Sequence, residues 1–327
     1  MKIIATILCS ILFAGSAFAA KQYSYFRVGN PNDIATSTTP GTVLMGGGTD
    51  VDAAFQWMCQ RSGNGDFLVI RASGTDAYNP YIQQLCPAEN SVATLIIPNL
   101  AAASDPFVIN AIQTAEALFI AGGDQSNYIN FWKGTPVEAQ LNALIARGAP
   151  IGGTSAGMNV LSEFVYSALA SQGVTSSQAL ADPFNRYITL DRDFVSISIL
   201  QGIIDDPHFV TRDRMGRDLA FLCRINLNGW SATPRDIAID EQTALLIDGA
   251  GKAIVVGVST VYFMQAPGPP QLCQPKMPLT YQNIAVYRID ANGSFNLSTW
   301  KGSGGTAYSV SANAGILSSS QSGGSIY

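Results

Sequence analysis

Histidine is nearly absent from this chain, since His208 is the single one in 327 residues. Catalytic zinc sites of hydrolases usually recruit two or three histidines, so most zinc hydrolases are excluded, and no metal or other cofactor is expected. Charged residues are also scarce, at 13% with a net charge of −5, and no run of lysine or arginine occurs. Such a chain offers no electrostatic footprint for nucleic acid or for an anionic membrane. Any nucleophile that an imidazole activates here must use His208.

Long apolar runs are confined to the N-terminus. Lys2 precedes an apolar stretch over residues 3–15, and Ala17-Phe18-Ala19 supplies small residues at positions −3 and −1 of a cleavage site. This pattern predicts a signal peptide over residues 1–19 and a mature chain that begins at Ala20, hence a secreted or periplasmic protein without a membrane partner after cleavage. An uncleaved membrane anchor is the alternative.

Cysteine is present in a small even number once the signal peptide is removed. The mature chain keeps Cys59, Cys86, Cys223 and Cys273, none of them in a Cys-x-x-Cys pair. In an oxidising compartment this predicts two disulfides, and nearness in sequence favours Cys59–Cys86 and Cys223–Cys273. The alternative is four buried thiols.

Apolar runs alternate with amphipathic stretches, a pattern that predicts a parallel sheet covered by helices. The expected buried strands are nearly continuous apolar runs: residues 42–45, 67–72, 92–97, 117–121 and 150–153. Helices are expected at 51–58, 106–115 and 211–224, and mostly antiparallel strands at 237–239, 244–247, 253–256, 261–264 and 284–289. We therefore predict an α/β protein, a three-layer αβα sandwich with a mostly parallel central sheet and C-terminal antiparallel strands. Residues 20–300 would form a single catalytic domain with this C-terminal β elaboration, and residues 301–327 a Gly/Ser-rich tail.

A glycine-flanked serine follows one of the predicted strands, in the run Gly153-Thr154-Ser155-Ala156-Gly157. A nucleophile at a sharp strand-to-helix elbow requires small residues at positions −2 and +2. The residues after Ser155 predict a helix with Met158, Leu161 and Val165 on one face. We therefore predict that Ser155 is the nucleophile and that the Ala156 N–H, at the start of this helix, is an oxyanion donor. A glycine-rich turn with an incidental serine is the alternative.

A base and an acid must complete such a site. His208 is the one imidazole available, and a carboxylate must orient its ring and stabilise the imidazolium. Glu241 is the candidate for this carboxylate, with Asp240 as the alternative. Strand alternation would place the two side chains on opposite faces, so only one of them points inward.

Two further clusters predict substrate recognition. Gly122-Gly123-Asp124-Gln125 ends a buried strand at the carboxyl edge of the sheet, where open α/β sheets bind ligands. Gly123 could supply the second oxyanion N–H, and Gln125 could hydrogen-bond an amide or carboxylate. Arg212, Arg214 and Arg217 suit substrate carboxylates, although a solvated helix face with i,i+4 ion pairs is the alternative.

Together these motifs resemble cyanophycinase, a serine peptidase related to aspartyl dipeptidases with a class I glutamine amidotransferase-like, flavodoxin-like fold. The resemblance rests on the Gly122–Gln125 and Gly152–Gly157 runs and on the spaced pattern from Asp206 through His208 to Arg217. It implies hydrolysis of multi-arginyl-poly-aspartate (cyanophycin) to β-Asp-Arg dipeptides. Its site would contain the following residues: Ser155 as nucleophile, His208 as base, Glu241 as third member, and Gln125, Asp206, Arg212, Arg214 and Arg217 lining the substrate pocket. Asp206 would hold a substrate guanidinium group.

The chain departs from the family pattern at Pro207, where the pattern carries glutamine, and one polymer contact is expected to be lost or replaced. Other aspartyl or isoaspartyl peptides therefore remain an alternative substrate. An α/β-hydrolase esterase fits less well, because there the acid precedes the histidine. A non-catalytic binding protein of the same fold is the third alternative. The oligomeric state is open, with a homodimer among the options.

Overall fold

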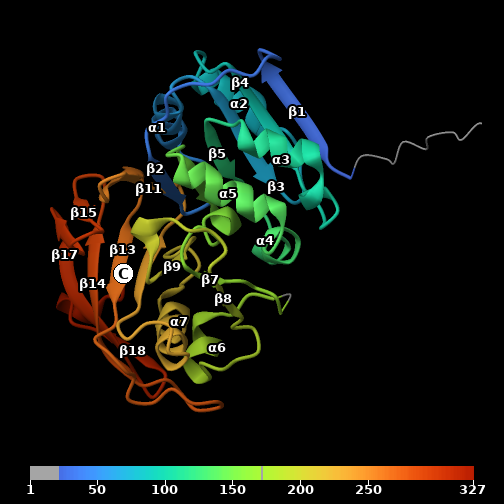
Figure 1. Ribbon diagram of the computed structural model, residues 1–327. Coiled ribbons are helices and arrows are strands. Elements are labelled where there is room, and N and C mark those ends of the chain that lie inside the picture. Colours follow the sequence, from blue (N-terminus) through green and yellow to red (C-terminus); the bar gives the residue numbers. More distant parts are fainter. Residues whose placement is uncertain (1–21, 171) are drawn as a thin grey trace, which may run out of the picture.

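The computed structural model describes residues 22–170 and 172–327. Within this part, the chain forms two β-sheets with helices packed on them (Figure 1). The predicted signal peptide, residues 1–19, lies outside the described residues. No helix in the described part is long and apolar enough to cross a membrane.

The first sheet has ten strands in the order β1-β4-β3-β5-β6-β2-β11-β12-β15-β16. Its five strands from β4 to β2 are parallel, whereas β1 and the strands from β11 onward pair antiparallel. The bounds are β1 Ser24–Gly29, β2 Gly41–Met45, β3 Asp66–Arg71, β4 Ser91–Ile96, β5 Ala117–Ile120, β6 Ile151–Thr154, β11 Thr243–Asp248, β12 Lys252–Gly257, β15 Ser294–Asn296 and β16 Lys301–Ser303. The predicted parallel core is confirmed.

Helices cover both faces of the parallel part. On one face α1 and α2 pack through Phe55, Met58 and Ile82, and on the other face α3, α4 and α5 pack through residues such as Trp132 and Leu141. Burial on both sides explains why these strands are nearly continuous apolar runs. The helices are α1 Asp52–Ser62, α2 Tyr78–Leu85, α3 Pro106–Gln113, α4 Gln125–Trp132 and α5 Pro136–Ala146. The predicted αβα sandwich is therefore confirmed.

The second sheet has eight strands in the order β18-β17-β14-β13-β10-β9-β7-β8. One face joins the core of the first sheet, and the other is covered by α6 and α7. Most of its pairs are antiparallel, but β7, β9 and β10 run parallel. The elements are β7 Phe164–Tyr166, α6 Ser176–Ala181, β8 Leu190–Arg192, β9 Ile203–Asp206, α7 Met215–Leu227, β10 Arg235–Ile239, β13 Val261–Gln265, β14 Tyr281–Ile289, β17 Thr306–Asn313 and β18 Ile316–Ser319.

The helix expected after Ser155 is not formed. Ser155–Gly157 make a single 3₁₀ turn, and the chain then runs to β7, which pairs with β8 and β9. Met158, Leu161 and Val165 are buried as expected, but as part of a turn and a strand. Tertiary contacts override helical periodicity here, because the Ser162 hydroxyl donates to Asp205 and Glu163 accepts from the Gly202 N–H, which holds the segment against β9.

Residues 301–327, expected as a Gly/Ser-rich tail, instead contain β16, β17 and β18. Tyr308, Val310 and Ala312 alternate along β17 and are buried in the core between the second sheet and α6 and α7. Pairing of β17 with β14 therefore orders a segment whose composition suggests a tail. Two disulfides, Cys59–Cys86 and Cys223–Cys273, have Cα–Cα distances of 6.3 and 6.5 Å. These are the pairings that nearness in sequence favours.

Candidate active site

Ser155 lies at a strained elbow directly after β6. Its φ is +52°, a left-handed conformation that is rare for a residue other than glycine. The flanking glycines are sterically required, since a Cβ on Gly153 would lie 2.4 Å from the Gly157 oxygen and one on Gly157 would lie 2.0 Å from the Ile120 oxygen. The run therefore forms the tight bend that presents the serine hydroxyl above the sheet edge.

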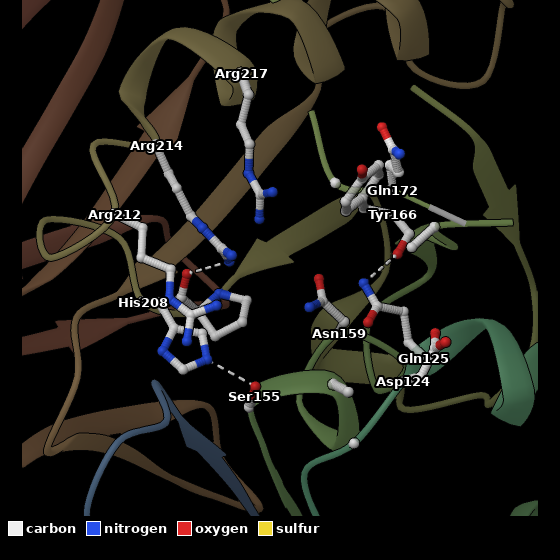
Figure 2. Close-up of a pocket in the computed structure, with 15 residues that line it drawn as sticks. Asp124, Gln125, Ser155, Asn159, Tyr166, Gln172, His208, Arg212, Arg214 and Arg217 are labelled. Carbon is white, nitrogen blue, oxygen red and sulfur yellow. Dashed lines mark hydrogen bonds between the residues drawn. The ribbon is translucent and has the colours of Figure 1, made fainter. Parts of the chain in front are cut away.

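The Ser155 hydroxyl contacts the His208 ring (Figure 2), and the other ring nitrogen of His208 contacts the Glu241 carboxylate. The Ser155 Oγ to His208 Nε2 distance is 2.7 Å, and the distance from His208 Nδ1 to Glu241 Oε1 is 2.5 Å. Ser155 follows β6 of the first sheet, whereas His208 and Glu241 follow the adjacent parallel strands β9 and β10 of the second. The site is therefore assembled across the junction of the two sheets.

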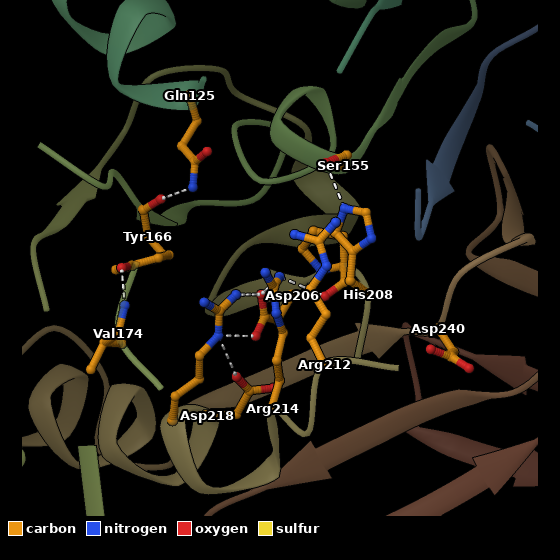
Figure 3. Close-up of polar contacts among 12 residues, drawn as sticks. Gln125, Ser155, Tyr166, Val174, Asp206, His208, Arg212, Arg214, Asp218 and Asp240 are labelled. Carbon is orange, nitrogen blue, oxygen red and sulfur yellow. Dashed lines mark hydrogen bonds and ion pairs between the residues drawn. The ribbon is translucent and has the colours of Figure 1, made fainter. Parts of the chain in front are cut away.

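Asp240, the alternative to Glu241, has a different place. Its Oδ1 accepts hydrogen bonds from the Val210 and Thr211 N–H groups, and its Oδ2 accepts one from the Ser259 hydroxyl. Although burial opposes the charged form, these bonds hold the pKa of Asp240 below its usual value. Asp240 therefore fixes the loop after His208 from the side away from Ser155 (Figure 3), and Glu241 is the residue that contacts the imidazole.

The Gly46-Gly47-Gly48 run joins the two sheets beneath the imidazole. The His208 N–H donates to the Gly46 oxygen at 2.7 Å, and the Gln242 N–H donates to the Gly47 oxygen at 2.8 Å. Gly47 has a φ of +90°, and a Cβ there would lie 2.3 Å from His208 Cε1; a Cβ on Gly48 would lie 3.1 Å from that of Glu241. These glycines make room for the His–Glu pair. The glycine run could be recognised in the sequence as a flexible segment, but the sequence did not show that it lies against the His208 imidazole.

The electrostatic surroundings keep His208 a neutral base. Burial lowers the pKa of His208 below its usual value, and the charges of Arg212 and Arg214 lower it further against the opposing effect of Glu241. The imidazole is therefore uncharged at neutral pH, so its Nε2 can take the serine proton.

A cavity of about 260 Å³ opens above Ser155 (Figure 2). Gly123 and Ala156, the predicted oxyanion donors, both line it. Gln125 lines it too, and its Nε2 donates to the main-chain oxygen of Tyr166. Because a single 3₁₀ turn replaces the predicted helix after Ser155, the expected helix dipole at this position is absent.

Arg214, Arg217 and Asp206 form a buried ion-pair cluster beside this cavity (Figure 3). Asp206 is fully buried; Arg217 Nε donates to its Oδ2 at 2.7 Å, and Arg214 Nη1 donates to its Oδ1 at 3.1 Å. Although burial alone would raise it, these guanidinium groups hold the pKa of Asp206 below its usual value. The expectation that Asp206 holds a substrate guanidinium is therefore wrong, because the chain's own arginines occupy both carboxylate oxygens.

The three arginines differ in what they offer a substrate. Arg217 is almost fully buried on Asp206, and the ring of Tyr166 lies 4.9 Å from its guanidinium carbon. Arg214 lines the cavity, and burial lowers its pKa to about 10. The Arg212 side chain is 54% exposed, with its Nε 3.5 Å from Glu241 Oε1. The i,i+4 ion pairs of the alternative interpretation are not formed, because Arg214 and Arg217 both bind Asp206 and the Asp213 carboxylate accepts from the Tyr327 hydroxyl.

Three further buried carboxyl groups lie behind this cluster. Asp205, Asp218 and Asp236 are fully buried, and burial raises the pKa of each well above its usual value. Burial therefore disfavours the charged form of all three carboxyl groups, while Arg212 and Arg214 place positive charge at the cavity wall. Among residues 22–170 and 172–327, no group of three or more His, Cys, Asp or Glu side chains is arranged to hold a metal ion.

Sequence reasoning missed two residues at the site. Asn159 lines the cavity, is almost fully buried, and its Oδ1 has no hydrogen-bond partner in the described structure. Tyr327 contacts the loop between β9 and α7 that carries Arg212 and Arg214 (the arginine loop): its hydroxyl donates to Asp213 Oδ1 at 2.7 Å and accepts from the Met215 N–H at 3.0 Å. Tyr327 lies far from the motifs in sequence, so nothing in the sequence indicated its contact. Asn159, four residues after Ser155, was close enough to be considered, but it was treated only as part of the predicted helix.

Comparisons with known proteins agree with this geometry. The sequence profile of peptidase family S51 matches residues 42–255, a range that includes Ser155, His208 and Glu241. The cyanophycinase of Geminocystis herdmanii is 25% identical over 195 residues, which cover 58% of this chain and 65% of the relative. The cyanophycinase of Synechococcus elongatus is 29% identical over 173 residues, 52% of this chain and 48% of the relative. The match thus spans about half to two thirds of the length of these curated relatives.

A solved structure of a peptidase from an acI-B1 Actinobacterium shares the fold. The TM-score is 0.53 at 16% sequence identity, and the alignment covers 80% of this chain and 98% of that one. The residues that match the family profile make up more than half of the chain and include Ser155, His208 and Glu241. The chain belongs to peptidase family S51.

Proposed function

We propose that this chain is a serine-type exopeptidase that hydrolyses cyanophycin to β-Asp-Arg dipeptides. The observation that carries the proposal is the hydrogen-bonded series from Ser155 through His208 to Glu241, next to a cavity lined by arginines. The likeness to cyanophycinases supports the substrate. Aspartyl and isoaspartyl peptides of other composition are the second candidate, because Arg212 and Arg214 suit carboxylates of any such peptide.

The reaction begins with attack of the Ser155 oxygen on the scissile carbonyl carbon. His208 Nε2 takes the hydroxyl proton, and Glu241 stabilises the imidazolium that forms. The N–H groups of Gly123 and Ala156 stabilise the oxyanion. As the C–N bond breaks, the imidazolium returns the proton to the leaving amine, which leaves an acyl-enzyme ester on Ser155. Water, deprotonated by His208, then attacks the ester carbonyl; as the ester C–O bond breaks, the imidazolium returns the proton to the Ser155 oxygen, which releases the acid and restores the free serine.

The test incubates protein that begins at Ala20 with insoluble cyanophycin and, separately, with β-Asp-Arg and short α- and β-aspartyl peptides. β-Asp-Arg should accumulate from the polymer, and Ser155→Ala and His208→Ala should each abolish turnover. Ser298→Ala, at a hydroxyl that binds the Ala250 oxygen away from the site, is the control. Undiminished dipeptide release by either site variant would refute the mechanism. Hydrolysis of other aspartyl peptides but not of cyanophycin would leave the mechanism intact and show that cyanophycin is not the substrate. Binding of these peptides without hydrolysis would favour a non-catalytic binding protein.

We also propose that the protein acts outside the cytoplasm. The signal-peptide pattern over residues 1–19 and the two disulfides support export, since disulfides persist in oxidising compartments. Expression of the full chain in a bacterial host, followed by fractionation and N-terminal sequencing, should give a periplasmic or extracellular product that starts at Ala20. A full-length product retained in the inner membrane would show an anchor instead.

A further inference from the structure

A second cavity, of about 370 Å³, opens onto the same catalytic pair. It shares Gly123, Ser155, His208 and Arg212 with the first cavity, and its separate wall includes Asp50, Arg71 and Tyr78. Asp50 follows β2, Arg71 is the last residue of β3 and Tyr78 is the first of α2, so the cavity lies at the carboxyl edge of the parallel strands. A peptide has residues on both sides of its scissile bond, and each side needs room next to the nucleophile. Two cavities that meet at Ser155 provide that room.

The charges of the two cavities decide where a substrate cation can bind. The ion pairs described above remove Asp206 as a partner. Among the described residues that line either cavity, the remaining carboxylates are Asp124 and Asp50. Asp124 caps α4, since its Oδ1 accepts from the Ser126 N–H at 2.9 Å and from the Ser126 hydroxyl at 2.7 Å. Asp50 is therefore the carboxylate best placed for a substrate cation.

Asp50 is held in place and only partly solvated. The Tyr78 hydroxyl donates to its Oδ2 at 2.8 Å. Burial raises the pKa of Asp50, and this outweighs the lowering effect of the Tyr78 and Thr154 hydroxyls and of the Arg71 charge. A carboxylate that has lost part of its hydration gains more from a charge-assisted hydrogen bond than an exposed one does.

Arg71 gives the same cavity a fixed positive group. Its Nε donates to the Ser73 oxygen at 2.6 Å and its Nη1 to the Thr75 oxygen at 3.1 Å, which orients the guanidinium plane. A cavity with one carboxylate and one guanidinium is complementary to a ligand that carries both a cation and a carboxylate. An arginine residue with a free α-carboxylate is such a ligand.

We propose that the second cavity is a substrate subsite for an arginine residue on one side of the scissile bond, with Asp50 binding its guanidinium and Arg71 its α-carboxylate. This inference rests on the proposed function, because each repeat of multi-arginyl-poly-aspartate presents both groups. The first cavity, with Arg212 and Arg214, then takes the carboxylate-bearing unit on the other side of the bond.

The test measures binding and not turnover, so that it stands apart from the hydrolysis assay. Ser155→Ala protein is titrated calorimetrically with two peptides of two β-Asp-Arg units, in which one unit or the other carries neutral, isosteric citrulline in place of arginine. One citrulline position should weaken binding about 10- to 100-fold, the range expected for a charged hydrogen bond. Adding Asp50→Asn should abolish the discrimination at that position alone.

The matched control is Asp52→Asn, at an exposed carboxylate that accepts from the Tyr81 hydroxyl and lies outside both cavities. It should leave the discrimination unchanged. If Asp50→Asn does not fold, Asp50→Ser serves as the second variant. Discrimination that survives both Asp50 variants, or equal binding of the two citrulline peptides and the all-arginine peptide by Ser155→Ala, would overturn the subsite. Absence of cyanophycin hydrolysis by the unsubstituted protein would instead overturn the proposed function.

Discussion

Replacing Gly47 by alanine should displace the imidazole of His208. The new Cβ would lie 2.3 Å from His208 Cε1 and 2.6 Å from Nε2. Carbon atoms in contact are about 3.5–4.0 Å apart, so methyl and ring must separate by roughly 1 Å or more. The Ser155 Oγ to His208 Nε2 distance of 2.7 Å leaves no slack for such a shift. Since a misplacement of about 1 Å costs about 100-fold in rate, we expect kcat/KM to fall at least that far.

The control separates ring displacement from backbone strain. Gly47 has a φ of +90°, where any L-residue costs about 1–2 kcal/mol. Gly229 has a φ of +70° and no atom within 4 Å of its would-be Cβ, so Gly229→Ala carries the strain without the clash. Both variants should unfold at a lower temperature, but only Gly47→Ala should lose activity. A folded Gly47→Ala protein with wild-type kcat/KM on an aspartyl peptide would refute the placement of His208.

Four further perturbations follow from the site. Glu241→Gln should lower kcat by about 10³-fold or more with little change in KM, because the imidazolium loses its counter-charge; equal loss of kcat on Asp240→Asn alone would contradict this. Arg212→Gln removes a positive charge that lowers the pKa of His208, so the acidic limb of the kcat/KM profile should move to higher pH, and an unmoved limb would count against His208 as base. Asp236→Asn should raise the melting temperature at pH 8 more than at pH 5: the folded-state pKa of Asp236 lies above its unfolded value, so its contribution to stability falls as pH rises from about 4, and an equal shift at both pH values would contradict the raised pKa. Tyr327→Phe should raise KM a few-fold with kcat nearly unchanged, since the hydroxyl holds the arginine loop; unchanged KM would remove that role.

The sequence was sufficient to pair Ser155 with His208, because a glycine-flanked serine and a single histidine leave few alternatives. It also indicated the parallel core, whose strands are apolar on both faces. These features are local, or follow from scarcity, and so can be read without coordinates.

The rest depended on contacts between distant segments. Glu241 and Asp240 became distinguishable only when β9 and β10 lay side by side, which turned one carboxylate to the imidazole and the other to the loop behind it. The motif containing Asp206 resembles a substrate contact, yet burial pairs that residue with Arg214 and Arg217. The turn after Ser155 kept the apolar spacing of a helix, but strand pairing of β7 determined its conformation. The last residues are ordered by β14, which no local pattern could reveal.

The most direct measurement is the site and rate of covalent labelling by a serine-directed fluorophosphonate at pH 7, read by mass spectrometry of the intact protein and of its peptides. One label should appear per chain, on the peptide that contains Ser155, and its rate should fall by orders of magnitude in His208→Ala protein that remains folded. A label on another residue, or labelling of Ser155 at the same rate without the imidazole, would contradict the assignment of this hydroxyl and this ring as nucleophile and base.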